Sequence, residues 1–355
     1  MRLTLVTIVS TFSISALTTL PSLAFAQRAG LTTPEQSPAA VDSQMVGITE
    51  IKVSYHRPAV AGRKVWGELV PYGEVWRMGA NENTTISFST PVKLAGQPLP
   101  AGTYGLHAIP SASTWTVIVS TMASAWGSYG YTQKEDAYRF TTTPVVGDFT
   151  ERLAYRFDDP TDAGVTLSMH WDKVVLPIKI EVDTPAAVMA SMRLELRGGQ
   201  QFNSAAWNQA ANYWLEHGGA LSEAESMAQH AVNMQSTYQT LSTLALVADK
   251  KGDKKTAEAK RKEADPLASE ADLNIVGYTL LSQHKNEESL AVFQKNAQRH
   301  PASWNVYDSL ADAYLAKGDT KAAVDSYGKA LKLVKDDANR TRIEATIARL
   351  KAKKT

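Results

Sequence analysis

The sequence predicts a two-domain protein, in which an antiparallel β-sandwich or jelly-roll-like domain is followed by an all-α solenoid. The first observation is that the hydrophobic period changes from two residues to that of a helix after Asp183-Thr184-Pro185. The second is an internal repeat of 34 residues in the later half. The third is the length, since 355 residues exceed what one hydrophobic core ordinarily holds.

Residues 1–26 have the pattern of a secretory signal peptide. Arg2 supplies a positive start, an apolar stretch rich in Ser and Thr follows, and Ala24-Phe25-Ala26 has the small-x-small pattern of a cleavage site. A membrane anchor is the rival interpretation, which the hydroxyl residues and Pro21 disfavour. We expect cleavage after Ala26 and no stable membrane insertion of the mature chain.

The composition narrows the location and the partners. The chain has no cysteine, which excludes disulfides, thiolate metal sites and a cysteine nucleophile. An exported chain without disulfides fits a bacterial protein, periplasmic or secreted, better than a eukaryotic one. The net charge of +1 lacks the basic surplus expected of a nucleic-acid-binding protein.

The β-domain is expected over residues 46–183, after a flexible polar lead at 27–45. In "ITEIKVSY" the apolar residues Ile51, Val53 and Tyr55 share one face, and "TWTVIVS" places Trp115, Val117 and Val119 together. Turn signals rich in Gly and Pro separate many such short runs. This spacing favours an antiparallel sandwich. Residues 184–200 are expected to form a connecting helix.

The repeat identifies the helical domain. A shift of 34 residues matches Gly277 with Ala311, Leu280 with Tyr314 and Phe293 with Tyr327. Small and large residues at these positions are typical of tetratricopeptide (TPR) repeats, and two weaker copies precede them. We expect about four TPR-like repeats over 204–338, then a capping helix and basic tail over 339–355. An unrelated helical bundle is the alternative.

Several separate motifs in the β-domain resemble a known bacterial family, the "domain of unknown function 2911". They lie within residues 45–182 and are Arg57-Pro58, Gly62-Arg63-Lys64, Val70-Pro71-Tyr72-Gly73, Trp76-Arg77-Met78-Gly79-Ala80-Asn81-Glu82 and Leu99-Pro100-Ala101-Gly102-Thr103-Tyr104. The resemblance implies a compact, exported, β-rich domain, followed in some members by TPR repeats. It implies no reaction, because the family has none assigned.

The segment "VWRMGANENTT" at residues 75–85 is the first candidate ligand site. Arg77 offers a rigid fork of donors that suits a carboxylate or a phosphate, and Trp76 a flat stacking face. Alternatively, Trp76 belongs to the core, and Arg77 pairs with Glu82 or Asn81 within the loop. Polar loop residues on a β scaffold are a reasonable place to look for function.

Aromatic residues in expected loops extend this candidate set. They form either a stacking platform for a sugar or a lid packed over one end of the sandwich. The candidate ligand-binding residues are Tyr72, Trp76, Arg77, Asn81, Glu82, His107, Trp126 and Tyr129. No metal site or cofactor is expected, because the histidines show no ligand spacing and no nucleotide-binding loop occurs.

Two functions remain open at this point. The first is an exported, non-catalytic binding or scaffold protein, whose solenoid holds a protein or peptide and whose β-domain holds a small polar or carbohydrate ligand. The second is a cell-envelope hydrolase acting on carbohydrate or a small polar substrate, which requires Arg77, Glu82 and His107 to converge. No nucleophile elbow or ordered triad supports the second hypothesis.

Overall fold

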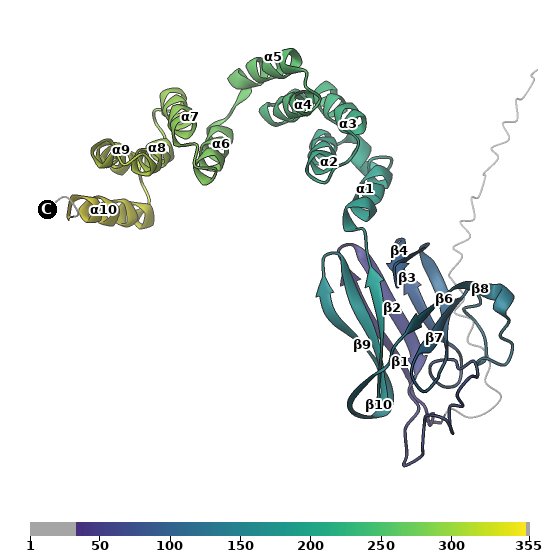
Figure 1. Ribbon diagram of the computed structural model, residues 1–355. Helices are drawn as coiled ribbons and strands as arrows, with labels where there is room; N and C mark the ends of the chain where they lie inside the picture. Colours follow the sequence, from purple (N-terminus) through teal and green to yellow (C-terminus); the bar gives the residue numbers. More distant parts are fainter. Residues whose placement is uncertain (1–32, 353–355) are drawn as a thin grey trace, which may run out of the picture.

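The computed structural model describes residues 33–352, and these form a β-sandwich followed by an arch of ten α-helices (Figure 1). The predicted fold class is thereby confirmed. The expected leader, residues 1–26, lies outside the described residues. None of the described helices combines the length and the apolar character needed to cross a membrane.

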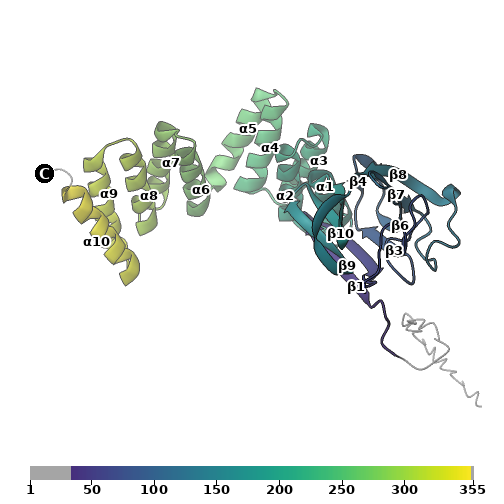
Figure 2. The ribbon, with the colours of Figure 1, turned by 60° about the horizontal axis from the view of Figure 1, so that its bottom comes forward.

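Ten strands form two antiparallel sheets, which lie face to face (Figures 1 and 2). The six-stranded sheet contains, in spatial order, β1 (Ala39–Val46), β2 (Thr49–His56), β3 (Thr84–Phe88), β6 (Gly102–Ile109), β7 (Trp115–Ser120) and β8 (Asp136–Thr142). The four-stranded sheet contains β5 (Gln97–Leu99), β4 (Val92–Leu94), β10 (Gly164–Glu181) and β9 (Val145–Thr161).

The core between the sheets includes four tryptophans. Trp115 and Trp171 are fully buried, and Trp66 and Trp76 pack against them. The rings of Trp66 and Trp115 meet edge to face with centroids 4.7 Å apart, and those of Trp76 and Trp171 stack at 5.8 Å. Such aromatic pairs stabilise a core beyond the area they bury. Trp76 thus packs against the core, which is the second of the two roles expected for it.

Strand β1 corrects the expected start of the domain. The sequence predicts a flexible lead over residues 27–45, but the last seven of these residues belong to a strand that pairs with β2 from Ala39↔His56 to Val46↔Thr49. The strand lies at the edge of the six-stranded sheet, and only Val46 at its end is buried. Because an edge strand buries little, its hydrophobic alternation is weak, and the ordered domain begins earlier than the pattern indicated.

Helix α1 (Thr184–Glu195) connects the two domains. It begins at Asp183, whose carboxylate accepts a hydrogen bond from the Ala186 amide at 3.0 Å, with Pro185 in the first turn. This is the usual chemistry of a helix start. The N-cap is therefore Asp183.

The remaining helices form pairs, as the repeat predicted. The pairs are α2 (Ser204–Glu216) with α3 (Leu221–Met234), α4 (Tyr238–Lys250) with α5 (Lys254–Ala264), α6 (Glu270–Ser282) with α7 (Asn286–Arg299), and α8 (Trp304–Ala316) with α9 (Thr320–Leu333). Helix α10 (Asp337–Ala352) packs on the last pair through Ile343. Gly277 of α6 lies directly against the Phe293 ring of α7, so the small and large positions meet as expected.

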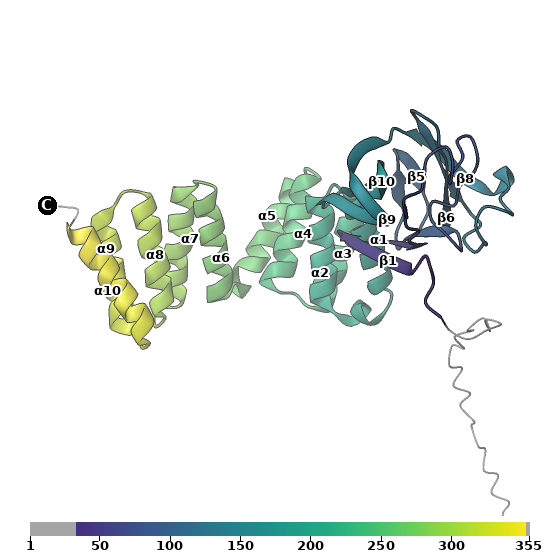
Figure 3. The same ribbon diagram turned by 90° about the horizontal axis from the view of Figure 1, so that it is seen from below.

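The helical array is divided between α5 and α6. Buried apolar side chains of α1–α4 form one cluster, whereas those of α6–α10 form two clusters that both reach Tyr307 and Tyr314. Across the division, Asp265 pairs with Lys295 and Arg299 of α7, and Gln239 binds Asp272. Figure 3 shows the two halves set apart at this place. Polar contacts rather than a shared core therefore join them.

Candidate functional site

The segment 75–85 is bound to strand β6 by backbone hydrogen bonds. The amide and carbonyl of Trp76 exchange two 2.8 Å bonds with those of Ala108. The Trp76 indole donates to the Gly79 carbonyl at 3.2 Å. Asn81 then takes a left-handed backbone with φ of 56°, which turns the chain toward β3. Hydrogen bonds of its own backbone and indole thus shape this segment.

The register of Trp76 with Ala108 places Arg77 opposite His107 on the outer face of the sheet. In an antiparallel pair the Cβ atoms of such residues are roughly 4.5–5.5 Å apart. Arg77 is half-buried, and its Nε is fully buried with no acceptor among the described residues. Its guanidinium lies against Gly127, where a Cβ would be 2.8 Å from Nη1.

His107 is a buried, neutral histidine. Only 3% of its surface is exposed, and Nδ1 lies 2.9 Å from the Ser128 hydroxyl. Burial lowers its pKa to about 4, because the charged form loses its hydration, and Asp136 opposes this only in part. The Tyr131 ring lies 5.5 Å away. At neutral pH this imidazole is therefore uncharged, and it contributes hydrogen bonds but no charge to the site.

Residues 121–132, here called the covering loop, hold Arg77 and His107 beneath them. Asn83 fixes the loop, because its amide donates to the Ala125 carbonyl at 3.0 Å and its side-chain oxygen accepts from the Ala125 amide at 2.8 Å. At the far end Tyr131 donates to Asp136 at 2.9 Å. Neither these anchors nor Ser128 are among the candidate residues predicted from the sequence. The available signal was Gly105, because a glycine inside a strand often marks a close approach of another backbone.

Glu82 does not join Arg77 and His107 by contact. Its carboxylate lies 3.4 Å from Nε2 of His56, which Glu35 also approaches at 3.3 Å. Asn81 donates to Glu35 at 3.3 Å. The described contacts therefore include no ion pair between Arg77 and Glu82, and none joins Glu82 to His107.

The aromatic candidates differ in their surroundings. Trp126 is 63% exposed and Tyr129 86% exposed, on either side of Gly127 and Ser128 in the covering loop. Trp126 and Glu82 both line a groove of about 480 Å3 beside β1 and β2. Tyr72 is 47% exposed and contacts Gly67 instead. Among the described residues no three acidic or histidine side chains are grouped to hold a metal ion.

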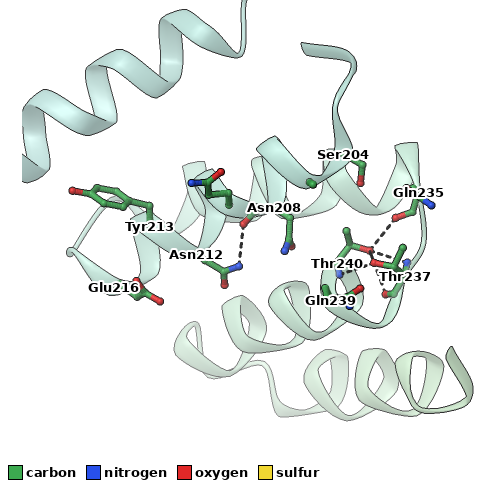
Figure 4. A pocket seen from close by; sticks show the side chains of 11 residues that line it. Ser204, Asn208, Asn212, Tyr213, Glu216, Gln235, Thr237, Gln239 and Thr240 are labelled. Carbon is green, nitrogen blue, oxygen red and sulfur yellow. Dashed lines mark hydrogen bonds between the residues drawn. The ribbon is translucent and has the colours of Figure 1, made fainter. Parts of the chain in front are cut away.

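A second candidate site lies in the solenoid (Figure 4), in a groove of about 660 Å3 between α2 and α4, which we call the amide groove. It is lined by Ser204, Ala205, Asn208, Gln209, Asn212, Tyr213, Glu216, Gln235, Thr237, Gln239 and Thr240. In Figure 1 both helices face the inside of the arch. Sequence reasoning named no residue here, although Asn208 and Asn212 share a helix face by their spacing.

Amide side chains dominate this groove. Asn212 donates to the Asn208 carbonyl and to the Thr243 hydroxyl, each at 3.1 Å. The side-chain oxygen of Asn208 is buried and accepts no hydrogen bond in the described chain. Glu216 is the one lining residue with a formal charge at neutral pH. The groove is therefore suited to polar, uncharged groups such as peptide units.

The β-domain matches a known family. Residues 37–180 match the family model described as "Protein of unknown function (DUF2911)". The resemblance inferred from the Trp-Arg-x-Gly-Ala-Asn-Glu and Leu-Pro-Ala-Gly-x-Tyr motifs is confirmed for this part of the chain. No curated protein matches the chain. The DUF2911 match carries no activity, so the site must be interpreted from its own geometry.

Solved TPR-type structures resemble the helical half. The MamA protein is 16% identical, with coverage of 42% of this chain and 81% of that one and a TM-score of 0.27. YrrB, described as a TPR protein with an unusual peptide-binding site, is 17% identical (45% and 84% coverage, TM-score 0.27). PilF of Pseudomonas aeruginosa is 21% identical (44% and 71% coverage, TM-score 0.29). TM-scores this low support no further argument, so we assign the solenoid from the helix pairs of this structure and not from these similarities.

Proposed function

We propose that the protein is an exported, non-catalytic scaffold whose solenoid binds an extended peptide segment of a partner in the amide groove. The observation that carries this proposal is the unsatisfied acceptor of Asn208 in a groove of amide side chains. A buried acceptor without a donor costs about 1–3 kcal/mol, and a rotation of the Asn208 side chain toward the groove would let a peptide N–H supply that donor. Export is supported by the leader-like residues 1–26.

The same feature recurs along the inner helices. Asn274 of α6 and Asp308 of α8 each lie three residues before the small residue of their repeat, as Asn208 does in α2. Each of the three also has one buried side-chain oxygen that accepts no hydrogen bond in the described chain. Acceptors repeated along a solenoid match the repeated donors of an extended backbone.

The hydrolase hypothesis is not favoured, since Glu82 contacts His56 rather than Arg77 or His107. The binding hypothesis can be tested with cross-linking. A photoreactive amino acid at Gln209, on the rim of the amide groove, should cross-link a defined partner in intact cells. The same amino acid at Glu258, on the outer helix α5, serves as the control. Equal labelling patterns from both positions, or none from either, would contradict peptide binding in the groove.

A further inference from the structure

We propose that the β-domain binds an oxyanion, the carboxylate or phosphate group of a small molecule, at Arg77 beneath the covering loop. This site is distinct from the amide groove of the solenoid. The proposal rests on three features of the described residues, which are an arginine without a partner, free amides beside it, and acids that are already engaged.

Arg77 differs from four other arginines of the β-domain, each of which has a hydrogen-bond or ion-pair partner. Arg57, Arg63 and Arg152 donate to backbone carbonyls, and Arg139 pairs with Asp136. The Arg77 side chain makes no hydrogen bond or ion pair within residues 33–352, although its Nε is fully buried. A guanidinium presents donors in a fixed fork that matches a carboxylate or phosphate, so the missing acceptor is the kind of group that a ligand supplies.

Backbone donors lie beside the guanidinium. Gly127 contacts Arg77, and its φ of +67° turns the chain into the left-handed region at this point. The amides of Gly127 and Ser128 donate no hydrogen bond to the described chain. Successive free amides around a left-handed residue are a common cradle for anions. The Ser128 hydroxyl, held by His107, adds a further polar group at the same place.

The acids nearest to this site are engaged elsewhere. Asp136 pairs with Arg139 and accepts from Tyr131, while Glu35 and Glu82 both lie against His56. The positive charge of Arg77 is therefore not neutralised by contact. Trp126 and Tyr129 stand exposed on either side of the free amides, where their rings can cover the body of a ligand whose anionic group reaches Arg77.

The test uses the full chain and two probes, inorganic phosphate and succinate, at constant ionic strength. The backbone resonances of Gly127 and Ser128 and the Nε resonance of Arg77 should shift saturably in 15N-correlated NMR spectra with at least one probe. A response to phosphate alone or to succinate alone supports the proposal and identifies the class of ligand. Linear shifts without saturation, or saturable shifts confined to other residues, would overturn it.

Variants provide an independent check. Arg77→Gln should weaken binding of the responding probe at least tenfold, and Arg77→Lys should weaken it less, because the charge remains while the fork is lost. Arg156→Gln removes the same charge from an exposed position on β9 and should leave the affinity within twofold. Equal weakening by the Arg77 and Arg156 substitutions would show general charge attraction and refute a site. Should Arg77→Gln not fold, the wild-type spectra decide the question.

Discussion

Gly105 lies directly beneath the carbonyl oxygen of Met122, so close that a Cβ on the glycine would overlap that oxygen. Its φ is not positive, so the requirement for glycine here is one of space rather than of backbone conformation. The covering loop can rest on the sheet only because strand β6 has no side chain at this position. The loop in turn brings Gly127 and Ser128 to Arg77 and His107.

Gly105→Ala should therefore destabilise the β-domain by about 1–3 kcal/mol, the usual range for overpacking. Gly130→Ala is the matched control, because it lies in the same loop, has no heavy atom within 4 Å of its Cβ position and needs no positive φ. It should change the stability by less than about 0.5 kcal/mol. Urea denaturation followed by tryptophan fluorescence measures both, and equal effects would show that the close approach does not matter.

His107 should make stability depend on pH in a defined window. Its folded pKa of about 4 lies below the ordinary value of 6.5, so the unfolded chain binds a proton first as the pH falls. The stabilising contribution is complete above pH 6.5 and is lost as the pH falls from 6.5 to 4. In NMR titrations the His107 ring signals should show a midpoint near 4. A midpoint near 6.5 would contradict the burial described here.

A variant separates this effect from general acid sensitivity. His107→Gln should flatten the dependence of the unfolding free energy on pH between 6.5 and 4. His284→Asn, at an exposed turn where asparagine tolerates the left-handed backbone, should leave it unchanged.

The contact of Gly277 with Phe293 predicts a reversal of the usual effect of glycine in helices. Gly→Ala in a helix interior ordinarily stabilises by about 1 kcal/mol, and Gly328→Ala in α9, where the Cβ meets open space, should do so. Gly277→Ala should destabilise, because its Cβ would overlap the Phe293 ring. In a Phe293→Leu background its cost should shrink. Additive effects in this double-mutant cycle would exclude the steric explanation.

Glu223 should contribute to acid sensitivity of the helical domain. Hydrogen bonds from Arg193, at 2.6 and 2.8 Å, and from the Trp214 indole lower its pKa to about 2. Because the folded pKa is lowered from 4.5, the contribution is complete above pH 4.5 and is lost as the pH falls toward 2. Circular dichroism across this range should show a smaller acid shift for Glu223→Gln than for wild type. Glu216→Gln, whose side chain makes no described ion pair, should behave as wild type.

The sequence predicted the architecture where hydrophobic periods are strong. The helix pairs follow from Gly277, Phe293 and their equivalents, because a repeat fixes many positions together. Strand β1 was missed because only Val46 of its eight residues is buried, which leaves little alternation to detect. An edge strand is held mainly by backbone hydrogen bonds to one neighbour, and such pairing requires few apolar residues in the sequence.

The candidate site was predictable as a segment but not as a set of contacts. The motif located Arg77 and Glu82, yet their partners depend on register and turn geometry. Arg77 lies beside His107 because Trp76 pairs with Ala108, and Glu82 reaches His56 after the left-handed turn at Asn81. Neither relation is local in sequence. The amide groove was missed because the repeat pattern reports helix packing, whereas the groove is lined by residues between the packing positions.

The division between α5 and α6 also has a consequence for how the solenoid unfolds. Cooperativity in a repeat array passes through the apolar contact between adjacent units, and here that contact is replaced by pairs such as Asp265 with Arg299. We therefore expect helices α1–α5 and α6–α10 to unfold as separate units, each with its own melting transition. Salt weakens the ionic link between them more than it weakens either unit, so ionic strength acts on their coupling and leaves each unit's own stability largely intact.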